Sequence, residues 1–162
     1  MPSVRYIGVL ATGYDVVDIA VAKKLGITVT NVPAYSTDSV AQLTFALLLE
    51  ICHHAGDLNI SVKNGQWCSS ADFCYWNNDL IELAGKTLGI IGFGRIGQRV
   101  AKIADAFGMK AIAYDPTAEV PGNMNVTLVQ LDQLLKQSDI ITLHCPLTAE
   151  TQGIINKNSM QK

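Results

Sequence analysis

The sequence is short of charge, of paired cysteines and of long apolar runs, and each shortage excludes a class of protein. Lys and Arg number 12 against 14 Asp and Glu, a net charge of −2, so no basic surface for nucleic acid is expected. The four cysteines include no Cys-x-x-Cys pair, and their spacing fits neither a zinc site nor a disulfide scaffold. The longest apolar stretch, residues 40–52, is interrupted by Gln42, Thr44 and Glu50 and falls short of the ~20 residues of a membrane span. Nucleic acid, a metal and a membrane are therefore not expected as partners.

The composition is otherwise that of a globular protein. With 162 residues, 49% of them hydrophobic, the chain is long enough for about one domain with an apolar core. Its first residues, Met-Pro-Ser-Val-Arg-Tyr, lack the charged and apolar regions of a signal peptide. We therefore expect a cytoplasmic protein.

The most informative stretch is the glycine-rich run from residue 88 to residue 97, Leu-Gly-Ile-Ile-Gly-Phe-Gly-Arg-Ile-Gly. In this pattern Gly92 permits a tight turn after a strand, Gly94 lets backbone N–H groups reach a pyrophosphate, and Gly97 lets the next helix pack closely on the strand. That helix, expected over about 95–107, would direct its free N–H groups and the positive end of its dipole at the anion. The run predicts a dinucleotide-binding site.

An acidic residue stands at the second position that such a site requires. Asp115 closes the next apolar run and lies 23 residues beyond Gly92, close to the ~20 expected for the acid that binds the adenosine ribose. Its charge would repel a 2′-phosphate, and residues 116–118 supply no cation to hold one. NAD rather than NADP is therefore the predicted cofactor.

Periodicity and turn residues predict the elements of the chain. In order, these are strand 5–10, helix 15–24, strand 27–31, a long helix that Asp38 or Thr37 can cap and that runs to about 57, a loop over 63–80, strand 87–91, helix 95–107, strand 111–114, a short run at Val126, helix 131–137 and strand 140–143. The first three turns of the long helix carry almost no charge, so we expect it to be buried between domains. The pattern predicts an α/β protein with a Rossmann-type, doubly wound parallel sheet. The sheet would supply strands 3-2-1-4 of the usual order and leave 140–143 as an exposed apolar edge.

The stretch from Leu134 through Ser138-Asp139-Ile140-Ile141 to His144-Cys145-Pro146, followed by Thr151, resembles a signature of the D-isomer-specific 2-hydroxyacid dehydrogenases. Residues 8–18 are similar to the substrate loop of that family, and residues 40–42 to the start of its interdomain helix. Residues 35–42 and 72–76 look most like its glycerate dehydrogenase, or hydroxypyruvate reductase, branch. The resemblance covers nearly the whole chain.

The resemblance implies an organisation and a set of site residues. Residues 1–35 would be part of a flavodoxin-like substrate domain, 36–84 the interdomain helix and loop, and 85–162 part of the NAD-binding domain. Backbone N–H groups of Thr12 and Gly13 would bind the carboxylate of a small 2-keto or 2-hydroxy acid. The remaining implied contacts are all to NAD: Gly92, Gly94, Arg95, Ile96 and Gly97 at the pyrophosphate, Asp115 at the ribose, and Cys145, Pro146 and Thr151 along the adenosine half. The full-length form would be a homodimer.

The catalytic groups of the resembled family are an arginine, a glutamate and a histidine, and all three would lie beyond Lys162. We therefore expect no catalytic residue in this chain, which would be truncated and without turnover alone. His144 is interpreted as a strand-end or cofactor-adjacent residue rather than as the catalytic acid. Two alternatives stay open, a non-catalytic NAD(H)-sensing module and an incomplete gene product. The substrate stays open too, because enzymes for glycerate, lactate, phosphoglycerate, formate and phosphite share the scaffold.

Overall fold

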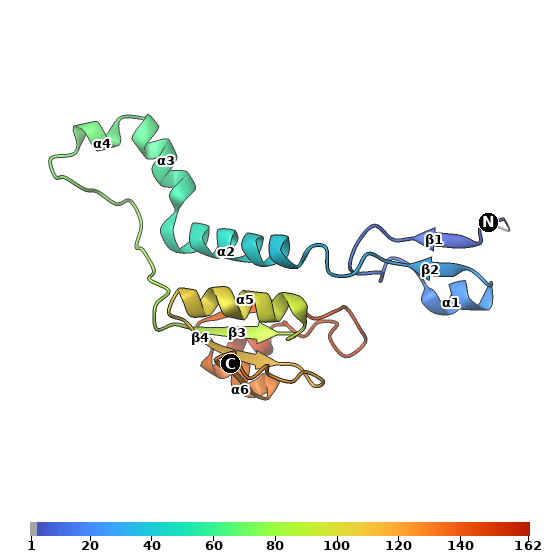
Figure 1. The fold of residues 1–162 in the computed structure, drawn as a ribbon. Coiled ribbons are helices and arrows are strands. Elements are labelled where there is room, and N and C mark those ends of the chain that lie inside the picture. The colour runs from blue at the N-terminus through green and yellow to red at the C-terminus, as the bar shows by residue number, and fades with distance from the viewer. Residues whose placement is uncertain (1–2) are drawn as a thin grey trace.

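The computed structural model describes residues 3–162 and has three parts, joined end to end in an elongated arrangement (Figure 1). A small lobe, residues 3–35, lies at one end. A long helix leads from it along the main sheet and then into two short helices that point away from the sheet (Figure 1). The first two residues of the segment 1–35 lie outside the described residues.

The small lobe is one β-α-β unit. Its strands β1 (Tyr6–Gly8) and β2 (Thr28–Thr30) pair in parallel, and helix α1 (Ile19–Lys24) crosses between them. The helix was expected from residue 15 but begins at residue 19, because the carboxylate of Asp18 accepts a hydrogen bond from the N–H of Val21 at 2.9 Å and so caps it. The loop between β1 and α1 carries the residues expected to bind substrate.

The long helix α2 spans Thr37–His53, so its predicted extension to residue 57 is wrong. The predicted cap at Asp38 or Thr37 is wrong too, because Ser36 holds the N-cap position. His54 adopts a left-handed conformation, with φ of 49°, which ends α2 and starts α3 (Ala55–Lys63) in a new direction. The carboxylate of Glu50 reaches past this corner and accepts the N–H of Gly56, 3.1 Å from each oxygen. The corner is thus closed by a side chain one turn upstream.

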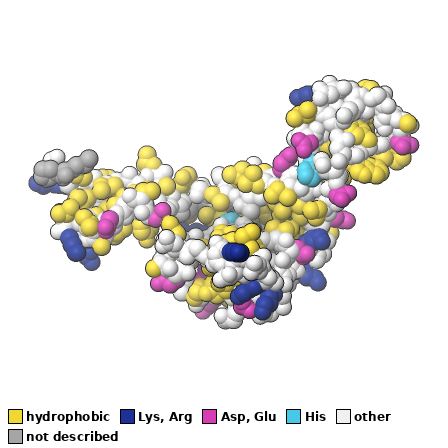
Figure 2. Space-filling model, turned by 180° about the vertical axis from the view of Figure 1, so that it is seen from behind, with side chains coloured by type: hydrophobic (Ala, Val, Ile, Leu, Met, Phe, Trp, Pro, Cys, Tyr) yellow, Lys and Arg dark blue, Asp and Glu magenta, His cyan; other side chains and the backbone are white. Residues whose placement is uncertain are grey.

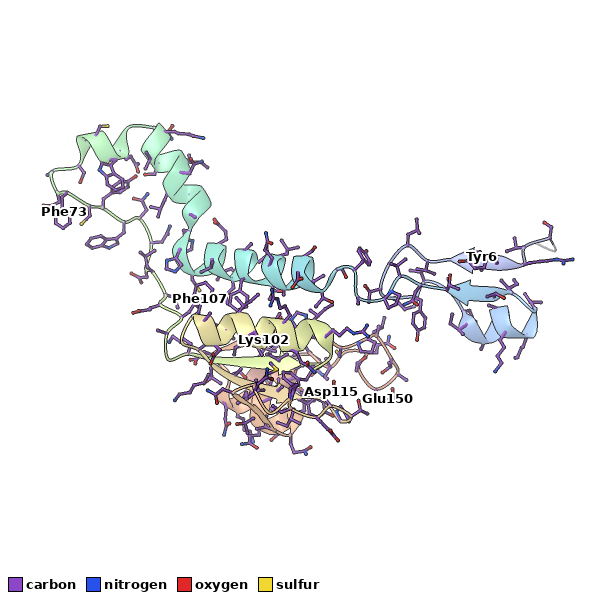
Figure 3. All side chains as sticks on the ribbon, in the orientation of Figure 1. Tyr6, Phe73, Lys102, Phe107, Asp115 and Glu150 are labelled. Carbon is purple, nitrogen blue, oxygen red and sulfur yellow. The ribbon has the colours of Figure 1, made fainter. Side chains whose placement is uncertain are left out.

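The loop expected over 63–80 contains one further short helix, α4 (Gln66–Ser69). Its return segment is held by polar side chains, since the buried hydroxyl of Ser61 lies 2.9 Å from the hydroxyl of Tyr75 and accepts a hydrogen bond from the side-chain amide of Asn77 at 3.3 Å. We call α3, α4 and the segment to residue 80 the arm. Phe73, at its outer turn, is 92% exposed (Figure 3).

The main sheet has four parallel strands, and their predicted order is confirmed. They run β5 (Val126–Leu128), β4 (Lys110–Tyr114), β3 (Thr87–Ile91) and β6 (Ile140–Leu143) across the sheet, with the two helices α5 (Arg95–Ala106) and α6 (Leu131–Gln137). Figure 1 shows α5 on one face of the sheet and α6 on the other. This is a doubly wound α/β arrangement, as expected.

Helix α2 shares its core with the main sheet rather than with the small lobe. The ring of Phe45 stacks on that of Phe107, which is labelled in Figure 3 at the end of α5, with centroids 5.4 Å apart. Asp38 forms an ion pair with Arg99 at 2.7 Å. The opposite face of α2 is exposed, so the expectation that this helix is buried between domains is not met on that face within residues 3–162: Leu43 and Leu47 are each 58% exposed. In the described part of the chain, α5 is the main neighbour of α2, and α3 makes a smaller contact with it.

Hydrophobic side chains also lie exposed on the small lobe and on the arm (Figure 2). They include Leu10 and Val16 on the small lobe and Trp67 on the arm, all more than half exposed. Across residues 3–162 no helix combines the length and the apolar character that crossing a membrane would take.

Candidate functional site

The glycine turn after β3 is fixed by the packing of the protein itself. Gly92 has φ of 92°, and a Cβ there would overlap the backbone of His144 and Cys145, which follow β6. A Cβ on Gly97 would overlap the carbonyl oxygen of Gly92. Both glycines are therefore required for strand, turn and helix to approach one another.

Gly94 differs from Gly92 and Gly97, because a Cβ on Gly94 would meet nothing within 4 Å. It precedes helix α5, whose first turn has no capping side chain. Open space in front of free N–H groups at the start of a 12-residue helix matches what the pyrophosphate of a dinucleotide needs. The residues present fit that group.

Asp115 stands at the carboxyl end of β4, beside the glycine turn (Figure 3). Its Oδ2 accepts the backbone N–H of Phe93 at 2.9 Å, and its Oδ1 accepts the N–H and the hydroxyl of Thr117 at 2.9 and 3.0 Å. Partial burial raises the pKa of Asp115, but the hydrogen bonds from Thr117 and Phe93 outweigh this effect and hold the pKa below its ordinary value. The carboxylate is thus ionised and fixed in place.

A cleft of about 690 Å³ separates the small lobe from the main sheet. One wall carries the predicted substrate-binding residues Thr12 and Gly13, and the other carries Gly94 and the residues after β3 and β6. The full lining is Thr12, Gly13, Tyr14, Asp15, Ala34, Ser36 and Thr37 on the first wall, and Gly94, Arg95, Ile96, His144, Cys145, Pro146, Leu147 and Thr148 on the second. Seven of the eleven predicted site residues therefore meet at one cleft.

The other four predicted residues lie away from the lining of the cleft. Gly92 and Gly97 form the turn behind it, and Asp115 holds that turn from the side. The hydroxyl of Thr151 donates to the carbonyl oxygen of Pro146 at 2.6 Å and accepts the N–H of Thr148 at 2.8 Å. Thr151 therefore shapes the loop that follows Cys145.

Residues that sequence reasoning missed hold the loop at Thr12. The side-chain amide of Asn31 donates to the carbonyl oxygen of Thr12 at 2.8 Å, and the hydroxyl of Ser36 lies 3.0 Å from that of Thr12. One signal could have found them, since both follow the carboxyl end of β2, the end at which parallel strands place ligand-binding loops.

His144 lines the second wall in a half-buried position. Its Nε2 lies 2.8 Å from the hydroxyl of Thr142, and burial lowers the pKa of the imidazole below its ordinary value. The ring is therefore neutral near neutral pH, which leaves Arg95 and Asp15 as the charged side chains of the lining. Within residues 3–162 no three His, Cys, Asp or Glu side chains are grouped so as to hold a metal ion.

The parallel sheet, the glycine turn and the acid after β4 together define a dinucleotide-binding α/β protein. Residues 45–162 match the NAD-binding domain of the D-isomer specific 2-hydroxyacid dehydrogenases, and the chain belongs to this family.

Curated relatives carry related names. The chain is 56% identical over 165 residues to a hydroxypyruvate reductase of Blautia hydrogenotrophica. The aligned region covers 99% of this chain and 50% of the relative. It is 48% identical over 150 residues to a hydroxypyruvate reductase of Thermotoga maritima, covering 93% of this chain and 47% of the relative. The chain thus spans about half the length of these relatives.

A solved structure agrees with the fold. The D-lactate dehydrogenase of Aquifex aeolicus, complexed with NAD and lactic acid, superimposes with a TM-score of 0.86 at 38% identity. The match covers 99% of this chain and 47% of that one.

Proposed function

We propose that this chain forms the cofactor crevice and the carboxylate-binding loop of an NAD-dependent dehydrogenase that interconverts hydroxypyruvate and D-glycerate. The observation that carries the proposal is the cleft that places Thr12 and Gly13 opposite Gly94 and Arg95. The names of the two relatives described above support hydroxypyruvate as the substrate.

The second wall of the cleft would hold the dinucleotide. Free N–H groups at the start of α5, with Arg95 and Ile96 beside them, would bind the pyrophosphate, and Gly94 leaves the space for it. The ionised carboxylate of Asp115 would accept hydrogen bonds from the adenosine ribose and would repel the 2′-phosphate of NADP. Cys145, Pro146 and Thr151 would follow the adenosine half.

The first wall would hold the substrate. N–H groups of Thr12 and Gly13 would donate charge-assisted hydrogen bonds to its carboxylate and so fix which face of the keto carbon is presented. When bound, NADH supplies a hydride to that carbon, and a proton on the carbonyl oxygen completes D-glycerate. His144 is not assigned this proton transfer, because its ring is neutral and its Nε2 is engaged by Thr142. We therefore propose that the 162-residue chain binds NADH without turning it over.

The first test is the fluorescence titration of NADH with the wild-type chain, Asp115→Ala and Gly94→Val. Saturable binding should be lost in both variants, because one removes the ribose acceptor and the other fills the pyrophosphate space. Asp105→Ala removes an exposed carboxylate of α5 and is the matched control, which should bind as wild type does. A wild-type chain that binds no NADH contradicts the proposal.

The second test adds hydroxypyruvate to the chain with NADH. No oxidation of NADH is expected, and measurable turnover would contradict the proposal that the chain binds NADH without turning it over. The amide resonances of Thr12 and Gly13 should shift on addition of hydroxypyruvate. NADH binding without any response of these amides would favour a non-catalytic NAD(H)-sensing module instead.

A further inference from the structure

Ser36 occupies the N-cap position of α2, yet its side chain does not cap the helix. Serine at this position normally accepts a backbone N–H of the first turn. Here the hydroxyl lies 3.0 Å from the hydroxyl of Thr12, which belongs to the loop between β1 and α1. A group that usually stabilises its own helix is therefore directed at the proposed carboxylate-binding loop.

Further bonds tie the same loop to the same linker. The side-chain amide of Asn31 donates to the carbonyl oxygen of Thr12 at 2.8 Å, and the N–H of Val32 donates to that of Ala11 at 3.2 Å. Thr12 is thus held at its carbonyl by Asn31 and at its side chain by Ser36. Its own N–H group is not used in these contacts.

The linker between β2 and α2 has an unusual backbone conformation at one residue. Ala34 has φ of 69°, in the left-handed region that residues other than glycine rarely adopt. The hydroxyl of Thr37 donates to the carbonyl oxygen of Ala34 at 3.1 Å and supports the turn. This turn precedes Ser36 and leads the chain into α2 beside the Thr12 loop.

Packed elements continue from Ser36 to the cofactor wall. Helix α2 begins at Thr37 and packs on α5 through the stacked rings of Phe45 and Phe107. Helix α5 in turn begins at Arg95, on the second wall of the cleft. The contact between Ser36 and Thr12 therefore connects α2 and α5, and with them the second wall of the cleft, to the carboxylate-binding loop.

We propose that Ser36 is a positioning residue whose hydroxyl holds Thr12 in register with the glycine turn across the cleft. The inference rests on the proposed function, in which the N–H groups of Thr12 and Gly13 bind the substrate carboxylate. Ser36 itself would not touch the reacting atoms. Its effect is on the affinity for the keto acid and not on that for the dinucleotide.

The experiment uses the 162-residue chain labelled with ¹⁵N and saturated with NADH. Hydroxypyruvate is titrated while the amide resonances of Thr12 and Gly13 are followed. Ser36→Ala should weaken hydroxypyruvate binding about fivefold, the effect of one net hydrogen bond. The Kd for NADH should change less than twofold, and the melting temperature should fall only slightly, because one hydrogen bond is lost but no helix cap is. Ser36→Thr should restore binding, and Ser39→Ala, at an exposed serine of the same helix, should bind as wild type does.

Thr12→Val removes the same hydrogen bond from its other side. If the two hydroxyls act through each other, the double variant with Ser36→Ala binds hydroxypyruvate no more weakly than Thr12→Val alone. Additive losses, or wild-type affinity in Ser36→Ala, would overturn the inference while leaving the proposed function intact. A parallel loss of NADH affinity and melting temperature in Ser36→Ala would also overturn it. Amides of Thr12 and Gly13 that ignore hydroxypyruvate in the wild-type chain would instead contradict the proposed function, and the inference with it.

Discussion

The backbone N–H of Phe93 donates to Oδ2 of Asp115 at 2.9 Å, which joins the acid after β4 to the middle of the glycine turn after β3. Asp115 therefore has a structural role as well as its proposed role as ribose acceptor. Any substitution that alters cofactor choice at this position also removes a support of the turn that would bind the pyrophosphate.

Asp115→Asn tests the structural role. A carboxamide has a single acceptor oxygen and cannot serve both Phe93 and Thr117, so we expect a loss of about 1 kcal/mol in the free energy of unfolding at neutral pH. Asp105→Asn, on the exposed side of α5, should cost less. Chemical denaturation of the two variants measures the difference, and equal stabilities would contradict the structural role.

Asp115→Asn should also change how the stability of the chain depends on pH. Because the folded-state pKa of Asp115 lies below its ordinary value of 3.8, its contribution to stability is present above that value and is lost as the pH falls through the lowered pKa. Wild type should therefore lose stability more steeply than Asp115→Asn on acidification below about pH 4. Thermal unfolding between pH 6 and pH 2.5 provides the comparison, and parallel curves would exclude this source of acid sensitivity.

Gly92→Ala and Gly94→Ala should have opposite profiles. At Gly92 the left-handed backbone and the neighbouring backbone of Cys145 exclude a Cβ, so we expect a loss of about 2 kcal/mol or more in the free energy of unfolding. At Gly94 a Cβ enters open space, so the melting temperature should stay near that of wild type while the affinity for NADH falls. Full NADH affinity in Gly94→Ala would show that this space is not the pyrophosphate site.

The glycine turn could be predicted from the sequence because its requirements are local. A strand, a tight turn and a helix need small residues at fixed spacing, and the acid follows one strand later. The end of α2 could not be predicted in this way, since it depends on a left-handed His54 and on Glu50 reaching the N–H of Gly56. Histidine carries no strong signal for a helix end, and no local rule indicates that a glutamate will accept a bond six residues ahead.

The missed residues of the cleft have a similar explanation. Ser36 and Thr12 are 24 residues apart, and Asn31 and Thr12 are 19 apart, so their contacts exist only once β1 and β2 have paired. A serine before a long helix predicts a cap, and tertiary structure assigns this one to another partner. The substrate-binding role of Thr12 and Gly13 was predicted from the resemblance alone. The contacts that hold these residues could not be predicted from it.

His144 predicts a second pH effect, near neutrality. Burial lowers the pKa of the folded-state imidazole below its ordinary value of 6.5, so the unfolded chain takes up a proton first as the pH falls. The free energy of unfolding should therefore decline from pH 6.5 toward the lowered pKa, and His144→Gln should show less of this decline. His53→Gln removes an exposed histidine and is the matched control. Urea denaturation at pH 7.5, 6.5 and 5.5 would reveal the difference, and an unchanged pH dependence in His144→Gln would contradict it.

The packing of α2 on α5 predicts unequal effects for its apolar and its charged contact. Phe45 is buried to 4% exposure, so Phe45→Ala should cost roughly 3 kcal/mol or more through lost burial and the cavity left behind. Arg99→Ala removes an exposed ion pair with Asp38 and should cost below about 1 kcal/mol. Chemical denaturation of both variants tests the ranking. A larger cost for Arg99→Ala would mean that charge, not the stacked rings, holds α2 against α5.

The open edge of strand β6 leads us to expect that this chain self-associates. In the described sheet β6 has a neighbour, β3, on one side only, and an open strand edge presents N–H and C=O groups that can pair with another chain. Leu143, the last residue of this strand, is 47% exposed, so Leu143→Lys places a charge where a second strand would dock. We expect sedimentation velocity to show oligomers of the wild-type chain and a shift toward monomer in Leu143→Lys. Leu47→Lys places a charge on the exposed face of α2 instead and should leave pairing at the edge of β6 intact. The two variants therefore distinguish association through the strand edge from association through the helix face. Dispersal by Leu47→Lys alone would assign the association to the helix face, and a sharply melting wild-type monomer would exclude both.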